Sequence, residues 1–179
     1  MLQNRSELEG VLRRPASLGA VFARHAYGMR RWVELFAIRI PEIKDAEVTE
    51  LVATIVSLNA KHVVMFRERA LAHGVDPDAY ICPPEGEVIY ERMAPLSTDE
   101  TLAYALGSLE HFADLLAVYA EAADAEQDAA VLAEVRADNE NAIVRLRTIV
   151  AEPMGPAADA HELYRLRELA ETPLYANGH

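Results

Sequence analysis

The stretch that decides the fold is residues 74–97, which read GVDPDAYICPPEGEVIYERMAPLS. Two glycines and four prolines fall within it. Because both residue types interrupt helices, we interpret it as a connection, with at most a turn or two of helix over residues 87–93. Short links force neighbouring helices to run antiparallel, whereas a link this long can run the length of a helical bundle. The helix that follows it would then begin at the far end of the bundle.

Apolar residues recur at three- and four-residue steps on both sides of this connection, as they do in helices with one buried face. The pattern predicts an all-α chain with four long helices over residues 15–40, 45–72, 97–123 and 124–151. Pro41 and Gly74 are stop signals for the first two helices, and Ser97 with Glu100 forms a capping-box pattern at the start of the third. The buried stripe predicted for the third helix is Leu102, Leu106, Leu109, Ala113, Leu116 and Ala120.

A fifth, shorter helix is predicted over residues 157–170, after Pro153, Gly155 and Pro156. Its leucines recur at three-residue steps and must be covered by other protein; they are Leu163, Leu166 and Leu169. We therefore divide the chain into a bundle domain, 1–156, and a C-terminal helix and tail, 157–179. We expect this second part to pack on the bundle or on a partner subunit, and the protein to be a homodimer.

The composition excludes several classes of protein. With 179 residues, of which 51% are hydrophobic and 26% charged, the chain can build one well-packed domain. The net charge of −12 repels phosphate backbones, so we expect no nucleic-acid partner. Charges interrupt every apolar stretch and the first residues lack a signal-peptide hydrophobic region, so we expect a cytoplasmic protein with no membrane partner. A single cysteine, Cys82, excludes an internal disulfide and a Cys-rich zinc site.

The clearest anomaly in the apolar pattern is a polar pair on the second long helix. Asn59 falls in the middle of an aliphatic stripe, and His62 lies one turn further along the same face. Buried polar groups need partners, so these side chains must face each other, another helix, water or a ligand. The pair is either a binding or coordination site in the bundle core or a structural hydrogen-bonded pair that sets the register of the helices.

The four-helix pattern resembles the ferritin-like superfamily over about residues 15–151. Di-metal members of that superfamily place one Glu on each of two helices and a Glu-x-x-His motif on each of the other two. Here Glu34 and Glu110 match the lone carboxylates, Asn59-Ala60-Lys61-His62 stands at the first motif, and Asp138-Asn139-Glu140-Asn141 stands at the second. The resemblance implies a ferritin-like bundle with one long crossover between its second and third helices. A plain up-down-up-down bundle with a large surface loop is the alternative.

The resemblance also implies a relation to non-haem di-metal oxidoreductases, but the ligand set is altered. Asn59 and Asn141 supply amides, which are poor ligands for iron or manganese and remove negative charge from the site. We therefore expect no intact di-iron centre and at most one iron or manganese ion. The metal ligands that the resemblance implies are Glu34, His62, Glu110 and Asp138. Helical phase places Glu34 off the buried stripe, so for this residue the alternative is a carboxylate paired with Arg30 or Arg31.

Three residues, His25, Asn59 and Asn141, are predicted to line a binding pocket for a small molecule. His25 falls on the buried stripe of the first helix and could meet His62 across the bundle, with Asn59 and Asn141 beside them. The alternative for His25 is a hydrogen bond to a neighbouring carbonyl.

Three classes of function follow from these residues. The first is a metal-dependent oxidoreductase that uses O₂ as oxidant, with His62 and the carboxylates as ligands. The second is a metal-free binding module, or an enzyme in which His62 is the catalytic general acid or base. The third is a structural bundle that functions through assembly.

Overall fold

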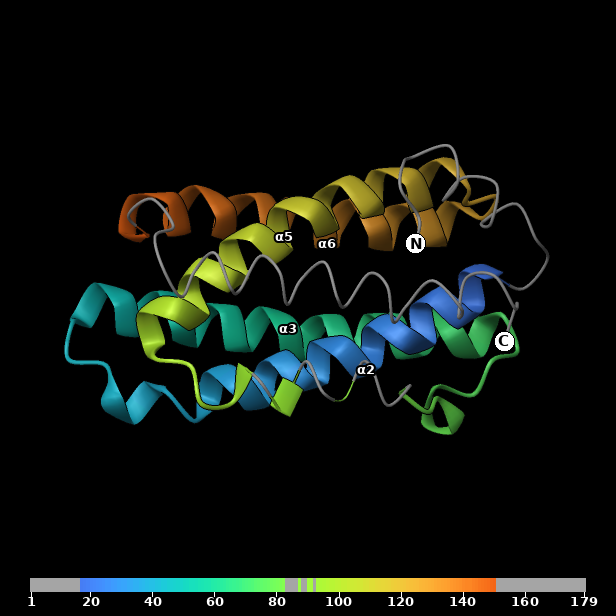
Figure 1. Cartoon of the computed structure of the whole chain (residues 1–179). Helices are drawn as coiled ribbons and strands as arrows, with labels where there is room; N and C mark the ends of the chain where they lie inside the picture. The colour runs from blue at the N-terminus through green and yellow to red at the C-terminus, as the bar shows by residue number, and fades with distance from the viewer. Residues whose placement is uncertain (1–16, 83–86, 88–89, 92, 151–179) are drawn as a thin grey trace.

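The computed structural model describes residues 17–82, 87, 90–91 and 93–150, and these residues form helices and no strand, which confirms the all-α prediction (Figure 1). The four long helices are α2 (Ser17–Ala37), α3 (Ala46–Ala72), α5 (Thr98–Glu121) and α6 (Glu126–Ile149). Two short 3₁₀ helices, η1 (Ile40–Glu42) and η2 (Pro77–Ala79), lie between them. The predicted fifth helix and the whole of the predicted second part, 157–179, fall outside the described residues.

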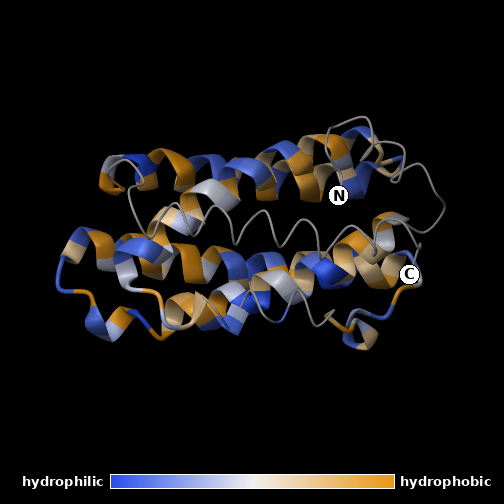
Figure 2. Ribbon diagram, viewed as in Figure 1, coloured by the Kyte–Doolittle hydropathy of each residue, from blue (hydrophilic) through white to orange (hydrophobic). Residues whose placement is uncertain are grey.

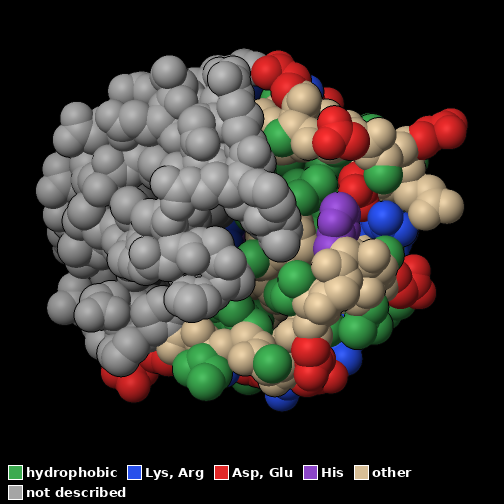
Figure 3. Space-filling view, turned by 90° about the vertical axis from the view of Figure 1, so that its right-hand side faces the viewer, with side chains coloured by type: hydrophobic (Ala, Val, Ile, Leu, Met, Phe, Trp, Pro, Cys, Tyr) green, Lys and Arg blue, Asp and Glu red, His purple; other side chains and the backbone are tan. Residues whose placement is uncertain are grey.

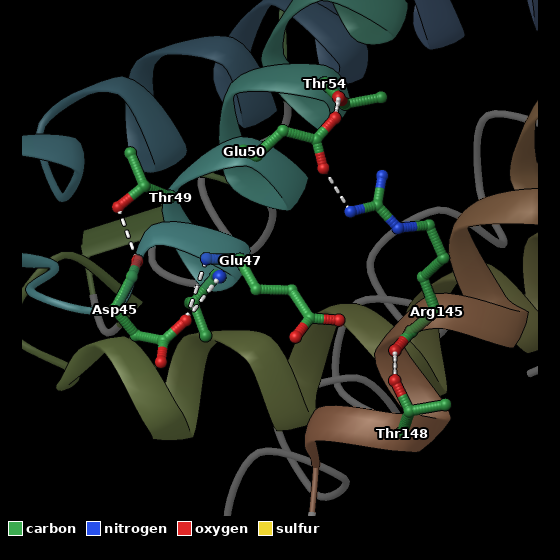
Figure 4. Close-up of polar contacts among 8 residues, drawn as sticks. Asp45, Glu47, Thr49, Glu50, Thr54, Arg145 and Thr148 are labelled. Atoms are coloured by element: carbon green, nitrogen blue, oxygen red, sulfur yellow. Dashed lines mark hydrogen bonds and ion pairs between the residues drawn. The ribbon is translucent and has the colours of Figure 1, made fainter.

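Side-chain caps set the starts of two helices. Asp45 precedes α3, and its Oδ1 accepts hydrogen bonds from the backbone N–H groups of Glu47 at 2.8 Å and Val48 at 3.0 Å (Figure 4). Ser97 and Glu100 form the predicted capping box at the start of α5. The end of α3 is marked by Gly74, whose positive φ of 73° is a conformation that suits glycine.

The helices form two close pairs, α2 with α3 and α5 with α6, and the main contact between the pairs is made by α3 and α6. Figure 1 shows the pairs lying one above the other, with α3 and α5 beginning at the same end of the bundle. The seam between α3 and α6 is lined by ion pairs, among them Glu50 with Arg145 (Figure 4). The exposed charges of this seam contribute little each, because water screens them.

The connection between α3 and α5 runs along α2. At the start of α2, Gly19 lies so close to the connection that a Cβ there would be 2.8 Å from Cγ2 of Val75. Further along, the rings of Tyr27 and Tyr80 are 5.3 Å apart. Beyond the end of α2, the guanidinium of Arg39 donates hydrogen bonds to the carbonyls of Met93 at 2.9 Å and of Leu96, later in the connection, at 3.1 Å. The described parts of the connection therefore contact α2 near its start and near its middle, and contact Arg39 beyond its end.

Two apolar clusters fill the interior, one at each end of the bundle. Figure 2 shows hydrophobic and hydrophilic residues interspersed along each of the four long helices. The first cluster lies where α2 and α6 begin, and its large side chains include Phe22, Phe66, Phe112, Leu116, Tyr119 and Leu132. The second cluster lies at the other end and includes Trp32, Phe36, Leu51, Ile55, Leu102 and Leu146. The helices bury these faces against one another, which is the main source of stability for amphipathic helices.

Among the described helices, only α3 is long and apolar enough to cross a membrane by length and composition. It pairs with α2, contacts α6, and buries two polar side chains, Asn59 and His62. These features are typical of the central helix of a bundle.

Candidate functional site

A break in the apolar packing occurs midway along α3. Asn59 and His62 are both buried there, between Ile55 of the second apolar cluster and Phe66 of the first. His62 is only 1% exposed. The sequence-based prediction that both side chains are buried is therefore confirmed.

Two other helices carry buried polar residues at matching positions. Ser108 on α5 and Asn139 on α6 are buried, and each has residues of the first cluster on one side along its helix and residues of the second on the other. The four side chains therefore lie at one level of the bundle, between the two apolar clusters. We call them the polar layer; they are Asn59, His62, Ser108 and Asn139.

His62 is held by a carboxylate at the edge of this layer. Its Nε2 lies 3.0 Å from Oδ2 of Asp138 on α6. Burial lowers the pKa of His62, and the hydrogen bond and negative charge of Asp138 only partly offset this, so the ring is neutral near pH 7. A carboxylate can only accept, so the ring proton is on Nε2 and Nδ1 carries a lone pair. This Nδ1 is buried and has no hydrogen-bond partner among the described residues.

Asp138 itself is ionised. Burial raises the pKa of Asp138, but the hydrogen bonds from His62 and Lys61 outweigh this effect and hold the pKa below its usual value. The Lys61 ammonium lies 3.0 Å from the same oxygen that His62 contacts, and 2.7 Å from Oε1 of Glu134. Asp138 thus joins a buried ring on one side to an exposed cation on the other.

The two asparagines of the polar layer differ in their partners. Nδ2 of Asn59 donates to the carbonyl of Ile55, one turn earlier, at 3.0 Å. Nδ2 of Asn139 is buried and has no partner in the part of the chain that the structure describes. Asn141, the residue that we predicted to line the pocket, is instead exposed, because it lies two positions further round the helix.

Of the predicted metal ligands, the structure brings together only His62 and Asp138. Glu34 pairs with Arg31 at 2.6 Å, as the alternative for it proposed, and with Arg30 at 3.3 Å. Glu110 pairs with Arg147 on α6 at 2.7 Å. Within residues 17–82, 87, 90–91 and 93–150, no group of three or more His, Cys, Asp or Glu could hold a metal ion.

The donors around His62 do not fit an iron or manganese centre. The oxygen of Asp138 nearest to His62 already binds the Lys61 ammonium, which would repel a divalent cation. Asn59 adds only an amide, and its Nδ2 is held by the helix backbone. The arrangement instead offers hydrogen bonds: an acceptor on His62 and a donor on Asn139, both inside the bundle.

Comparisons with protein-family models, with curated proteins and with solved structures found no match.

His25 belongs to a separate buried group in the first apolar cluster. Its Nε2 lies 2.7 Å from Nη2 of Arg24 and 3.2 Å from the hydroxyl of Tyr119, and its ring packs 4.6 Å from that of Phe112. The structure therefore places the His25 ring in a buried group with Arg24, Tyr119 and Phe112. Sequence reasoning did not find Arg24 or Tyr119, because an arginine and a tyrosine at a helix edge are usually exposed in part.

A second group that the sequence did not reveal surrounds a buried carboxylate at the end of the bundle. Asp128 is fully buried in the first turn of α6, and its carboxylate bonds Nε of Arg69 at 2.6 Å and Nε2 of His73 at 2.8 Å. We call these three residues the Asp128 cluster. Figure 3 looks onto this end of the bundle and shows histidine, basic and acidic side chains close together at the surface. In the sequence Asp128 ends an acidic run, which normally indicates a solvated face.

Proposed function

We propose that this protein is a ferritin-like helical bundle that binds one small molecule in its polar layer through His62, and that it lacks the metal centre of the di-metal oxidoreductases that it resembles. The connection along α2 supports the ferritin-like topology, because it lets α3 and α5 start at the same end. The observation that carries the binding function is the buried Nδ1 of His62.

An unpartnered buried acceptor is costly. Leaving such a group without a hydrogen bond costs on the order of 1–3 kcal/mol. Asp138 makes the cost unavoidable, because it draws the ring proton to Nε2 and so leaves Nδ1 as an acceptor. A ligand that donates to Nδ1 recovers this free energy, which makes His62 the anchor of the proposed site.

The test is the state of the His62 ring in the full-length protein, followed by ¹⁵N NMR before and during a titration with Mn²⁺. We expect a neutral ring protonated on Nε2 and no paramagnetic broadening of its signals at one equivalent of Mn²⁺. Strong broadening at His62 would show that the site holds a metal. A ring protonated on Nδ1 would remove the acceptor on which the proposal rests.

A further inference from the structure

We propose that the ligand of the polar layer is a small neutral molecule with one group that both donates and accepts hydrogen bonds, such as a primary amide or a hydroxyl, and that it bridges His62 and Asn139. This inference rests on the proposed function and adds the chemical class of the ligand. It is carried by two buried atoms of opposite polarity, Nδ1 of His62 and Nδ2 of Asn139, neither of which has a partner among the described residues.

The packing places these two residues at one level of the bundle. His62 on α3 and Asn139 on α6 both lie between the two apolar clusters. The His62 ring also reaches across to α6, where it contacts Asp138, the residue directly before Asn139. Asn139 is 5% exposed, so its amide lies on the interior side of α6 while Asp138 lies at the edge. One ligand between α3 and α6 can therefore meet both side chains.

The polarity of the two atoms selects against ions. An anion such as a carboxylate can accept from Asn139 but presents only lone pairs to the Nδ1 of His62, and two acceptors repel. A cation such as an amidinium can donate to His62 but has no lone pair for the Asn139 amide. In both cases one buried polar atom stays unpaired, and a desolvated charge is added to an interior that is costly for ions. A neutral group with a donor and an acceptor satisfies both atoms.

Three probes of nearly equal shape separate these cases: acetamide, acetate and acetamidinium. Each is titrated into the ¹⁵N-labelled full-length protein near pH 7, and the signals of the His62 ring and the Asn139 side-chain amide are followed. We expect acetamide to shift both sets of signals with one saturable affinity, and the two ions to leave them unchanged. A second titration with ethanol tests whether a hydroxyl is accepted as well.

Asn139→Leu removes the donor and keeps a side chain of similar size, so we expect acetamide to bind about tenfold more weakly to this variant. Asn141→Leu is the matched control, because Asn141 is an exposed asparagine on the same helix, and its affinity for acetamide should be that of the unmodified protein. Circular dichroism of both variants checks that the fold is kept.

The outcomes separate the two proposals. Binding of acetate or acetamidinium at His62 as tight as that of acetamide, or an unchanged affinity in Asn139→Leu, overturns the inference about the ligand and leaves the binding site at His62 standing. No response of the His62 ring to any of the probes overturns the proposed function together with this inference.

Discussion

At the scale of single residues, His62 is unusual because one carboxylate decides what the buried ring can bind. Asp138 is part exposed and ionised, and its Oδ2 accepts a hydrogen bond from the protonated Nε2 of the ring. The opposite edge then offers only a lone pair to the interior. The chemistry of the polar layer therefore depends on a residue that does not itself lie in it.

The lowered pKa of His62 predicts that acid destabilises the fold through this residue. The unfolded ring binds a proton near its usual pKa of about 6.5, whereas the folded ring does so only at lower pH. This contribution to stability is therefore complete above about pH 6.5 and is lost as the pH falls toward the lower folded pKa. Urea unfolding at pH 7.5, 6.5 and 5.5 should show a loss of up to about 1.4 kcal/mol per pH unit that is absent in His62→Gln. A variant with the same pH slope as the unmodified protein contradicts this.

Asn139→Leu should make the unliganded protein more stable. The change removes a buried amide whose Nδ2 has no partner among the described residues and replaces it with an apolar side chain of similar volume. We expect the free energy of unfolding to rise by about 1 kcal/mol in urea titrations. The exposed control Asn141→Leu should stay within about 0.5 kcal/mol of the unmodified protein. A loss of stability in Asn139→Leu would show that the amide is satisfied in the folded state.

At the scale of the elements, the Asp128 cluster joins the end of α3 to the start of α6. Its carboxylate sits in the first turn of α6, where the helix dipole favours negative charge, and both oxygens are bonded by side chains from the end of α3. The cluster therefore holds together the two helices that make the main contact between the pairs.

Asp128→Ala should destabilise the protein more than any change at an exposed carboxylate. It leaves the guanidinium of Arg69, which is 15% exposed, without its closest anionic partner. We expect a loss of about 2–4 kcal/mol in urea unfolding, and faster amide hydrogen exchange in the first turn of α6. Asp124→Ala, an exposed carboxylate just before α6, is the control and should change stability by less than about 0.5 kcal/mol. Equal losses of stability in the two variants would mean that the Asp128 cluster does not stabilise the fold.

The buried face of α5 differs in part from the stripe of leucines and alanines that the sequence predicted. Of the predicted stripe, Leu102 and Leu116 are buried, and the remaining residues are only half-buried. The fully buried face also contains Tyr104, Phe112 and Tyr119, which pack against aromatic and histidine side chains of α2. The leucines alone predict one buried face. The aromatic side chains are larger and bury more area, so the face that carries them packs against α2.

At the scale of the whole molecule, the two helix pairs meet mainly through α3 and α6. The described parts of the long connection lie against α2, and Arg39, beyond the end of α2, donates hydrogen bonds to three of its carbonyls. The predicted C-terminal helix would add a further apolar face, since its leucines recur at three-residue steps.

Removal of residues 157–179 tests whether this face takes part in packing. We expect the shortened protein to be less soluble, or to change its oligomeric state, because an apolar surface is then uncovered on the bundle or on a partner subunit. Light scattering coupled to size exclusion gives the mass of both proteins, and thermal unfolding gives their stability. A shortened protein of the same oligomeric state and melting temperature would show that the segment is an independent tail.

The sequence by itself determined the four long helices and the connection between them, because helical periodicity, caps and breakers are local signals. It also placed Asn59 and His62 in the interior, since both lie on one aliphatic stripe. Only the structure showed that Asn139 is buried while Asn141 is exposed, and that Asp128 is buried against side chains from the end of α3. The physical reason is that a buried carboxylate needs polar partners, and those of Asp128, which are Arg69 and His73, lie 59 and 55 residues away in the sequence.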